Sequence, residues 1–445
     1  MATQNGTRTV VRNATCTYCG CVCDDIDLTV ENNKIVKAAN ACVLGKAWFF
    51  NHNESHGTPG ALIKGQPATI EDAIERAARI LARARYPLVF GMSNTTNEAQ
   101  RYALEITERC GGCIDTTTSV CHGPTEIALQ GVGKVAATLG EVKNRADLLI
   151  YWGSNPAESH PRHLSRYTYT ARGLFTPNGK RDRYLVLVDV RRTPSARAAD
   201  EFVQIRPGTD FEALWILRSL ARGETVTKAD CAPTGIPLEQ FQALFERMKN
   251  AKYGVLFFGM GLSMSRGKSM NSAAIFMLAA DMNRHTKFLA MPMRGHGNVT
   301  GVDELLTWST GYPFAVNFSR GYPRFNPGEF TAVDVLARRE ADAALIVSSD
   351  PYGNFPRAAR EHLATIPVVI LDVKPNDTSA IAEVHITTAP YGIAVPGTVY
   401  RMDEIPIRLR VALESPYPSD EAVLSRMVAR IKALKREAAP AMAAD

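Results

Sequence analysis

The chain has 445 residues, of which 45% are hydrophobic and 22% are charged, as is typical of a globular protein with two or three domains. The net charge is +6 and the arginines are scattered without interleaved aromatic residues, so we expect no nucleic-acid partner. The sequence has no apolar run of the roughly 20 residues that a membrane span needs, and no signal-peptide pattern. We therefore expect a cytoplasmic protein without a membrane partner.

The first segment, residues 1–60, is expected to form a small cysteine-rich domain. Within it, residues 25–40 (DIDLTVENNKIVKAAN) alternate between apolar and polar side chains on both sides of the Asn32-Asn33 pair. This pattern predicts two short strands joined by a turn.

Residues 69–84 (TIEDAIERAARILARA) predict an amphipathic helix, with Thr69 as N-cap and Asp72 three residues later. A buried strand is predicted at residues 87–92 (PLVFGM), and a second amphipathic helix at residues 98–112. The apolar face of the first helix consists of Ile70, Ala73, Ile74, Ala77 and Leu81.

An internal repeat dominates the rest of the chain. Residues 146–205 and residues 341–387 each contain a buried strand that ends in Gly/Ser-Asn/Asp-Pro, a helix, a second strand that ends in Asp, and a third short strand. Another strand stands before each copy, PLVFGM before the first and YGVLFFGMG (residues 253–261) before the second.

Apolar strands spaced by helices predict an α/β protein with parallel sheets covered on both faces. We therefore expect two Rossmann-like halves, residues 61–235 and residues 236–395, joined by a linker near residues 223–236 and followed by a tail of one strand and one helix, residues 396–445.

The loops after the predicted strands are rich in small and hydrogen-bonding residues: GSNP, DVRRTPSA, GMGLS, SSDPYGN and DVKPNDTS. Parallel sheets bind ligands at the carboxyl ends of their strands. The loops predict a long, polar, phosphorylated ligand held between the two halves. The alternative is that these small residues only form tight turns.

Four of the nine cysteines crowd into residues 16–23. The spacing Cys16-x2-Cys19-x3-Cys23, with Cys42 nineteen residues later, offers the four thiolates that an iron–sulfur cubane needs. Structural zinc more often uses two Cys-x2-Cys pairs. The spacing favours a cluster, while zinc or a relic site without metal stays open.

Two further cysteine features are expected to play no part in the cluster. Cys21 breaks the spacing and is predicted to be spare. Cys110-x2-Cys113 resembles half of a zinc site, but it follows a helix at a Gly-Gly stop, so we expect two small core residues instead.

With this cysteine group ahead of two Rossmann-like halves, the chain resembles the molybdopterin oxidoreductases. GSNPAESHP, VDVRRTPSARAAD and IRPGTDFEAL resemble the loops of that family that contact pterin guanine dinucleotides. The resemblance implies a [4Fe-4S] cluster on the cysteine quartet and molybdopterin guanine dinucleotide with molybdenum or tungsten. It also implies that the dinucleotide is contacted by Gly153, Asn155, Asp189, Arg191, Thr193, Gly208 and Asp210.

TSVCHGPT (residues 118–125) and MPMRGHGNVTG (residues 291–301) narrow the resemblance to the B subunits of formylmethanofuran dehydrogenases. The formate chemistry of that family uses a metal-ligating cysteine with a neighbouring histidine and arginine. The matching residues are Cys121, His122 and Arg294.

The chemistry of these side chains agrees with the resemblance. A thiolate is a good ligand for molybdenum or tungsten, a histidine exchanges protons near neutral pH, and an arginine fork matches the carboxylate of formate. Taken singly, each residue also has an ordinary interpretation: a buried cysteine, a hydrogen-bonded histidine and a surface arginine.

The chain departs from the wider family in two places. The segment after residue 395 is too short for a domain that caps the dinucleotides, so we expect a small capping subunit and other subunits as partners. Related formate dehydrogenases have a lysine where this chain has Leu44, and Lys46 lies two residues later.

The sequence thus predicts an oxidoreductase subunit that interconverts carbon dioxide and formate for formylation of a furan-type one-carbon carrier. The alternative is a structural subunit without a redox step, as implied by the similar B subunit of a bacterial formyltransferase/hydrolase complex. A third possibility, a stand-alone formate dehydrogenase, is disfavoured by the short C-terminal segment.

Overall fold

The computed structural model describes residues 8–53 and 58–442, and the chain divides into two compact units. Unit 1 consists of Met1–Ser119, His296–Arg401 and Pro406–Asp445, and unit 2 consists of Val120–Gly295 and Met402–Ile405. No helix in the described part of the chain combines the length and the apolar character that a membrane-crossing segment requires.

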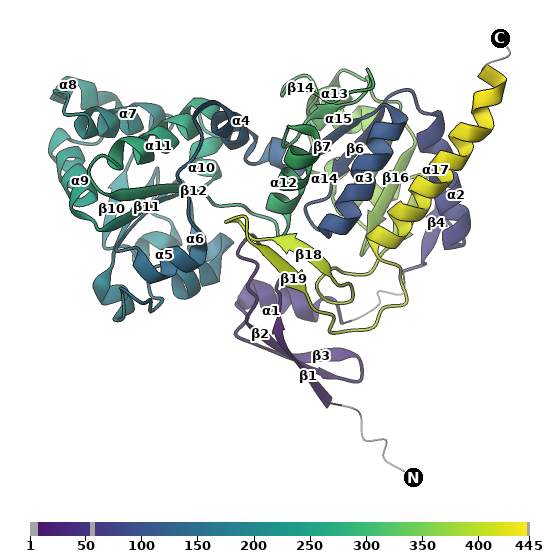
Figure 1. The fold of residues 1–445 in the computed structure, drawn as a ribbon, viewed down its shortest axis with the longest axis horizontal. Helices are drawn as coiled ribbons and strands as arrows, with labels where there is room; N and C mark the ends of the chain where they lie inside the picture. The colour runs from purple at the N-terminus through teal and green to yellow at the C-terminus, as the bar shows by residue number, and fades with distance from the viewer. Residues whose placement is uncertain (1–7, 54–57, 443–445) are drawn as a thin grey trace. The chain divides into compact units, whose positions relative to one another are not determined.

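Unit 1 begins with a three-stranded antiparallel sheet, β1 (Arg8–Ala14), β2 (Ile26–Glu31) and β3 (Lys34–Ala39), followed by helix α1 (Val43–Phe50) (Figure 1). Asn32 and Asn33 have φ angles of 51° and 58°, a left-handed turn that asparagine tolerates. The two strands and the turn expected in residues 25–40 are confirmed.

The main sheet of unit 1 has nine strands in the order β14-β13-β7-β6-β15-β16-β17-β4-β5. The five strands from β7 to β17 are parallel, and the short strands at both edges pair antiparallel. The strands are β4 (Ala61–Ile63), β5 (Gln66–Pro67), β6 (Pro87–Gly91), β7 (Cys113–Thr116), β13 (Val316–Asn317), β14 (Arg324–Phe325), β15 (Ala343–Val347), β16 (Val368–Asp372) and β17 (Val384–Thr387).

Both faces of this sheet are covered, because successive apolar side chains of its strands point to opposite sides. Val89 and Leu345 pack in the core under helices α2, α3, α12 and α17, whereas Leu88 and Ile346 pack in the core with α13 and α15. The helices of unit 1 are α2 (Ile70–Arg83), α3 (Asn97–Cys110), α12 (Val299–Thr310), α13 (Ala332–Ala337), α14 (Pro351–Asn354), α15 (Arg357–Leu363), α16 (Asp377–Ile381) and α17 (Asp420–Met442).

The first predicted helix is confirmed as α2. The backbone N–H of Asp72 donates to the Thr69 hydroxyl at 3.0 Å, so the expected N-cap is present. Buried Ala73, Ile74 and Leu81 lie on its apolar face.

Unit 2 contains a five-stranded sheet that is parallel throughout, in the order β10-β9-β8-β11-β12. Its strands are β8 (Leu148–Trp152), β9 (Tyr184–Asp189), β10 (Glu201–Gln204), β11 (Tyr253–Phe258) and β12 (Lys287–Pro292). Its helices are α4 (Gly123–Val132), α5 (Leu139–Arg145), α6 (Pro156–Ser159), α7 (Asp210–Ala221), α8 (Lys228–Cys231), α9 (Leu238–Asn250), α10 (Met260–Ser263) and α11 (Ser269–Met282). The two units together confirm the expected α/β class, with one parallel sheet and one mixed sheet.

Each copy of the repeat forms three adjacent parallel strands, β8-β9-β10 in unit 2 and β15-β16-β17 in unit 1. The strands expected to precede them are exchanged: β6 pairs with β15 of the second copy, and β11 pairs with β8 of the first. The expected division into halves at residues 61–235 and 236–395 is therefore wrong, because each sheet takes a strand from the other expected half. A fully apolar buried strand fits either sheet, so its composition does not reveal its partner.

Two other expected boundaries also change. The segment 223–236 lies inside unit 2 and contributes buried Cys231 and Ile236 to its core, so it is not a linker between halves. The C-terminal segment 396–445 contains two strands, β18 (Gly397–Tyr400) and β19 (Pro406–Leu409), before α17.

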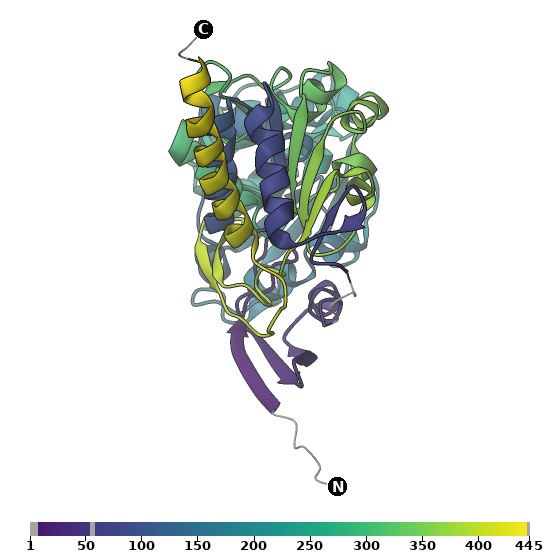
Figure 2. The same cartoon turned by 90° about the vertical axis from the view of Figure 1, so that its right-hand side faces the viewer.

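Helix α17 is an integral part of unit 1. Figure 1 shows it running beside α2 and α3, and the turned view in Figure 2 agrees. Its buried residues Leu424, Met427 and Ile431 belong to the same core as α2 and α3. Arg426 of the same helix is exposed and pairs with Glu71 at 2.8 Å.

We predict that Met427→Ala lowers the free energy of unfolding by about 2–5 kcal/mol, because it leaves a cavity in the core. The matched change Arg426→Ala on the same helix should cost at most about 1 kcal/mol, because an exposed ion pair is screened by water. Denaturant unfolding of both variants tests this. Equal losses would show that α17 is not anchored through its apolar face.

Candidate functional site

The seven residues expected to contact a dinucleotide lie at one edge of the sheet in unit 2. They lie at or just after the carboxyl ends of β8, β9 and β10, which is where parallel sheets bind ligands. Gly153 and Asn155 follow β8. Asp189 ends β9, with Arg191 and Thr193 after it. Gly208 and Asp210 follow β10.

One of these residues offers an unused polar atom. The Thr193 hydroxyl is buried, with the residue 7% exposed, and it has no hydrogen-bond partner among the described residues. Buried hydroxyls are normally bonded, so this one fits a polar ligand at the sheet edge. Burial also raises the pKa of the half-buried Asp189 carboxyl in the same loop region.

Three other residues of this set support the loops themselves. The Asn155 amide oxygen accepts from the Ser195 hydroxyl at 2.6 Å. Both Asp210 oxygens are engaged, by the Trp152 indole N–H at 2.9 Å and the Ser265 hydroxyl at 3.0 Å. Gly153 has a φ of 55°, and a Cβ there would lie 2.6 Å from the backbone nitrogen of Leu262, so only glycine fits. Sequence reasoning did not separate these supporting roles from ligand contacts.

The predicted cysteine quartet gathers in unit 1. A Cβ added to Gly45 would lie 3.1 Å from Cys16 Sγ and 3.7 Å from Cys42 Sγ, so this glycine leaves room for two sulfurs. The Cys16 N–H donates to the Cys23 carbonyl at 2.8 Å, which closes the loop. Burial raises the pKa of Cys16 well above its usual range, and the neighbouring sulfurs of Cys19, Cys23 and Cys42 raise it further.

The quartet does not form a preorganised site for a single ion. Within residues 8–53 and 58–442, no group of three or more Cys, His, Asp or Glu side chains is placed so that it could hold a metal ion. Buried thiols that resist ionisation also need a nearby cation to become ligands.

Three further cysteines, Cys21, Cys110 and Cys113, were expected to stay outside the cluster. Cys21 is 1% exposed and its thiol contacts those of Cys19 and Cys23, a proximity that its spacing did not predict. Cys110 and Cys113 pack in the two cores on opposite faces of the nine-stranded sheet, and Cys113 donates to the Phe330 carbonyl at 3.1 Å. The interpretation of this pair as core residues is confirmed.

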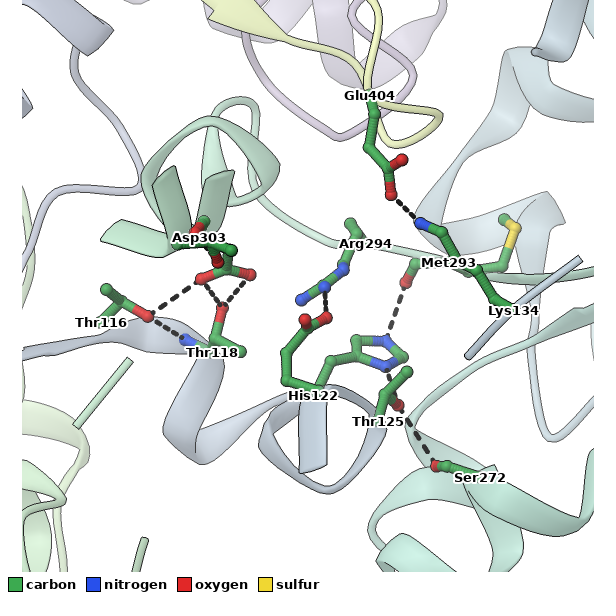
Figure 3. A network of polar contacts seen from close by, with 12 residues as sticks. Thr116, Thr118, His122, Thr125, Lys134, Ser272, Met293, Arg294, Asp303 and Glu404 are labelled. Atoms are coloured by element: carbon green, nitrogen blue, oxygen red, sulfur yellow. Dashed lines mark hydrogen bonds and ion pairs between the residues drawn. The ribbon is translucent and has the colours of Figure 1, made fainter. Parts of the chain in front are cut away.

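The segment that leads to Cys121 is held in unit 1 by carboxylates. The Thr118 hydroxyl contacts both Asp303 oxygens at 2.7 and 2.8 Å (Figure 3), and Ser119 donates to Asp115 at 2.7 Å. The chain passes into unit 2 at Val120. Cys121 itself is partly exposed, so its thiol is accessible to a ligand or metal.

His122 joins the two sequence motifs within unit 2. Its Nε2 lies 3.1 Å from the Met293 carbonyl oxygen, which can only accept, so Nε2 carries the proton. Its Nδ1 then accepts from the Thr125 hydroxyl at 3.1 Å, which in turn contacts Ser272 at 3.3 Å (Figure 3). Residues that are 171 positions apart are thereby tied together.

This geometry restricts the proton chemistry expected of His122. The ring is completely buried, and burial together with the Arg294 charge lowers its pKa to about 3. Both ring nitrogens are engaged, so the neutral ring acts as a tether in this arrangement. Proton transfer through Nε2 requires the contact with Met293 to open.

Arg294 forms a buried ion pair with Glu126 of α4, a partner that sequence reasoning missed. Arg294 is 6% exposed and Glu126 is 7% exposed, so the expected surface alternative for the arginine is wrong. A second histidine, His160, donates from Nε2 to the Arg294 carbonyl at 2.7 Å. The only sequence signal for Glu126 is its position four residues after His122, on the same helical stretch.

No protein-family model matches the chain. The B subunit of the tungsten-containing formylmethanofuran dehydrogenase 2 of Methanocaldococcus jannaschii is 44% identical over 431 residues, 95% of this chain and 99% of the relative. The chain belongs to the family of formylmethanofuran dehydrogenase B subunits. Members of this family are subunits of an oxidoreductase complex, as the motifs around Cys121 and Arg294 indicated.

More distant relatives share the fold. The B subunit of the formyltransferase/hydrolase complex of Methylorubrum extorquens is 27% identical over 76% of this chain and 88% of the relative. A crystal structure of that complex with methylofuran matches with a TM-score of 0.69 at 23% identity, over 84% of this chain and 99% of the other. Acetylene hydratase of Pelobacter acetylenicus matches with a TM-score of 0.65 at 13% identity, over 96% of this chain and 69% of the other.

A third buried histidine lies in the short π-helix His163–Tyr167 of unit 2. The His163 ring is completely buried and its Nδ1 lies 2.7 Å from the Tyr151 hydroxyl. Burial lowers the pKa of His163 well below its usual value, and the charge of His160 lowers it further. The folded protein thus keeps this ring neutral at pH values where the unfolded chain protonates it.

We predict that His163→Gln weakens the acid sensitivity of the fold. In the wild type, the His163 ring binds a proton below about pH 6.5 in the unfolded state but not in the native state. The free energy of unfolding therefore falls as the pH drops. The loss between pH 7 and pH 5 should be smaller in the variant by about 2 kcal/mol. Denaturant titrations at both pH values measure it, and identical losses in the two proteins would contradict the neutral buried ring.

Proposed function

We propose that this chain is the redox subunit of a formylmethanofuran dehydrogenase complex and interconverts carbon dioxide and formate for formylation of a furan-type one-carbon carrier. One observation carries the proposal: the contact of His122 with Met293 brings the Cys121-His122 motif beside Arg294 in the same unit. These are the residue types that bind a metal, a proton and a carboxylate.

The chain offers sites for two cofactors. Cys16, Cys19, Cys23 and Cys42 would hold a [4Fe-4S] cluster, in agreement with the clustered sulfurs around Gly45. Cys121 would bind molybdenum or tungsten, and the name of the 44%-identical relative favours tungsten. The unpartnered Thr193 hydroxyl and the loops at the sheet edge of unit 2 would receive part of a molybdopterin guanine dinucleotide.

The metal and its pterins would supply the two-electron chemistry, and the cluster would supply the electron path. The chain's own residues position the substrate. Arg294 presents N–H groups to a carboxylate, and its backbone is fixed by His160 and, through the preceding residue, by His122. His122 would carry a proton only after its Nε2 leaves Met293, since that atom is otherwise engaged.

Other subunits would complete the enzyme. The 44%-identical relative is a B subunit of its enzyme, and the B subunit of the formyltransferase/hydrolase complex is part of a larger assembly. We therefore propose a small subunit that caps the dinucleotides and another that uses the formate to form the formyl amide.

We predict that Cys121→Ala in the assembled complex abolishes formate-dependent dye reduction and removes the molybdenum or tungsten, while the iron content stays unchanged. The thiolate is the only bond from the chain to the metal in this proposal, so the loss should exceed 1000-fold, or about 4 kcal/mol. The matched control is Cys231→Ala, a buried cysteine in the core of unit 2.

Retention of both metal and activity in Cys121→Ala would contradict the proposed ligand. The alternative is a structural subunit like that expected of the formyltransferase/hydrolase complex. It would be favoured if the wild-type complex has no formate-dependent activity and the Cys121→Ala complex still transfers formyl groups normally.

A further inference from the structure

The proposed function does not use the pairing of Arg294 with Glu126. Both residues are more than nine-tenths buried in unit 2. Glu126 is the fourth residue of α4, in the first turn, where the helix dipole stabilises a negative charge. The carboxylate is therefore a built-in partner of the arginine.

The pair is held on both sides. On the arginine side, His160 binds the Arg294 carbonyl and His122 binds the carbonyl of the preceding residue, Met293. On the other side, α4 packs against α11. Separating the pair would take apart two opposite charges in a buried environment, which is strongly unfavourable. A substrate thus meets the two charges together.

Glu126 places a negative charge directly against the positive charge of Arg294. An anion near the arginine is attracted by one partner and repelled by the other, whereas an uncharged molecule such as carbon dioxide feels neither force at full strength.

We propose that Glu126 sets the anion affinity of the site: by neutralising Arg294 it weakens the retention of formate and lets the product leave, while the arginine still orients the carboxylate through its N–H groups. Glu126 is a positioning and charge-setting residue in this account, because it acts through Arg294. The inference rests on the proposed function, since it takes formate as the ligand of Arg294.

The test is Glu126→Gln in the assembled complex, which keeps the size of the side chain and an oxygen that accepts from Arg294 but removes the charge. Two quantities are measured: the KM for formate in dye reduction, and the Kd of formate by calorimetry without an electron acceptor. We expect both to fall at least tenfold, or about 1.4 kcal/mol, with kcat not increased. Damage to the fold cannot produce this result, because it weakens binding.

Glu246→Gln is the matched control: it removes the same charge from an exposed position on α9 of unit 2 and should leave both constants unchanged. If Glu126→Gln does not assemble, Glu126→Asp replaces it. The shorter side chain withdraws the carboxylate from Arg294, so the KM and Kd for formate should fall by a smaller factor, about threefold.

An unchanged or raised Kd for formate in Glu126→Gln, or in Glu126→Asp where that variant is used, would overturn the inference and leave the proposed function standing. A wild-type complex that neither oxidises nor binds formate would overturn the proposed function, and the inference with it. The two failures are thus distinguishable.

Discussion

The pairing of strands from distant parts of the chain determines where Cys121, His122, Arg294 and the loops of the candidate dinucleotide site lie. β6 joins β15 and β11 joins β8, so each sheet combines one repeat copy with a strand from elsewhere in the sequence. The outer partners of these strands, β7 and β12, lead directly to the two candidate motifs, Cys121-His122 and Arg294. The chain changes units right beside both motifs, after Ser119 and after Gly295.

The site in unit 2 is stabilised by polar groups that are buried and matched. Two neutral histidines bind the carbonyls of Met293 and Arg294, and an ion pair joins Arg294 to Glu126. Such networks are stable only when each donor and acceptor has a partner, and they then permit few alternative arrangements. The arginine side chain is consequently fixed before any substrate arrives, which reduces the entropy lost on binding.

Local patterns predicted the local structure well. The apolar periodicity gave the helix at Ile70–Arg83, Thr69 was the correct cap, and the Asn32-Asn33 pair formed the turn. The cysteine spacing also indicated that Cys16 and Cys42 lie close together, and both sulfurs lie near Gly45. These features depend on neighbours within about twenty residues, so the sequence alone contains them.

Long-range pairing and burial were not predictable in the same way. β6 and β11 are uniformly apolar, so the side-chain pattern of neither strand indicates which sheet it joins. Asp210 resembles a ligand contact in sequence, yet Trp152 and Ser265 occupy its oxygens. Glu126 reads as an ordinary helix residue until Arg294, 168 positions away, is placed against it. Each case is decided by a partner distant in sequence.

The central claim is that this chain carries a redox centre, and the most direct measurement is metal analysis of the intact complex, co-expressed with its partner subunits and purified without air, together with formate-dependent dye reduction. The account predicts about four irons from the cluster of this chain, about one tungsten or molybdenum per chain, and dye reduction that depends on formate. A complex that transfers formyl groups at full rate but contains neither tungsten nor molybdenum would contradict it.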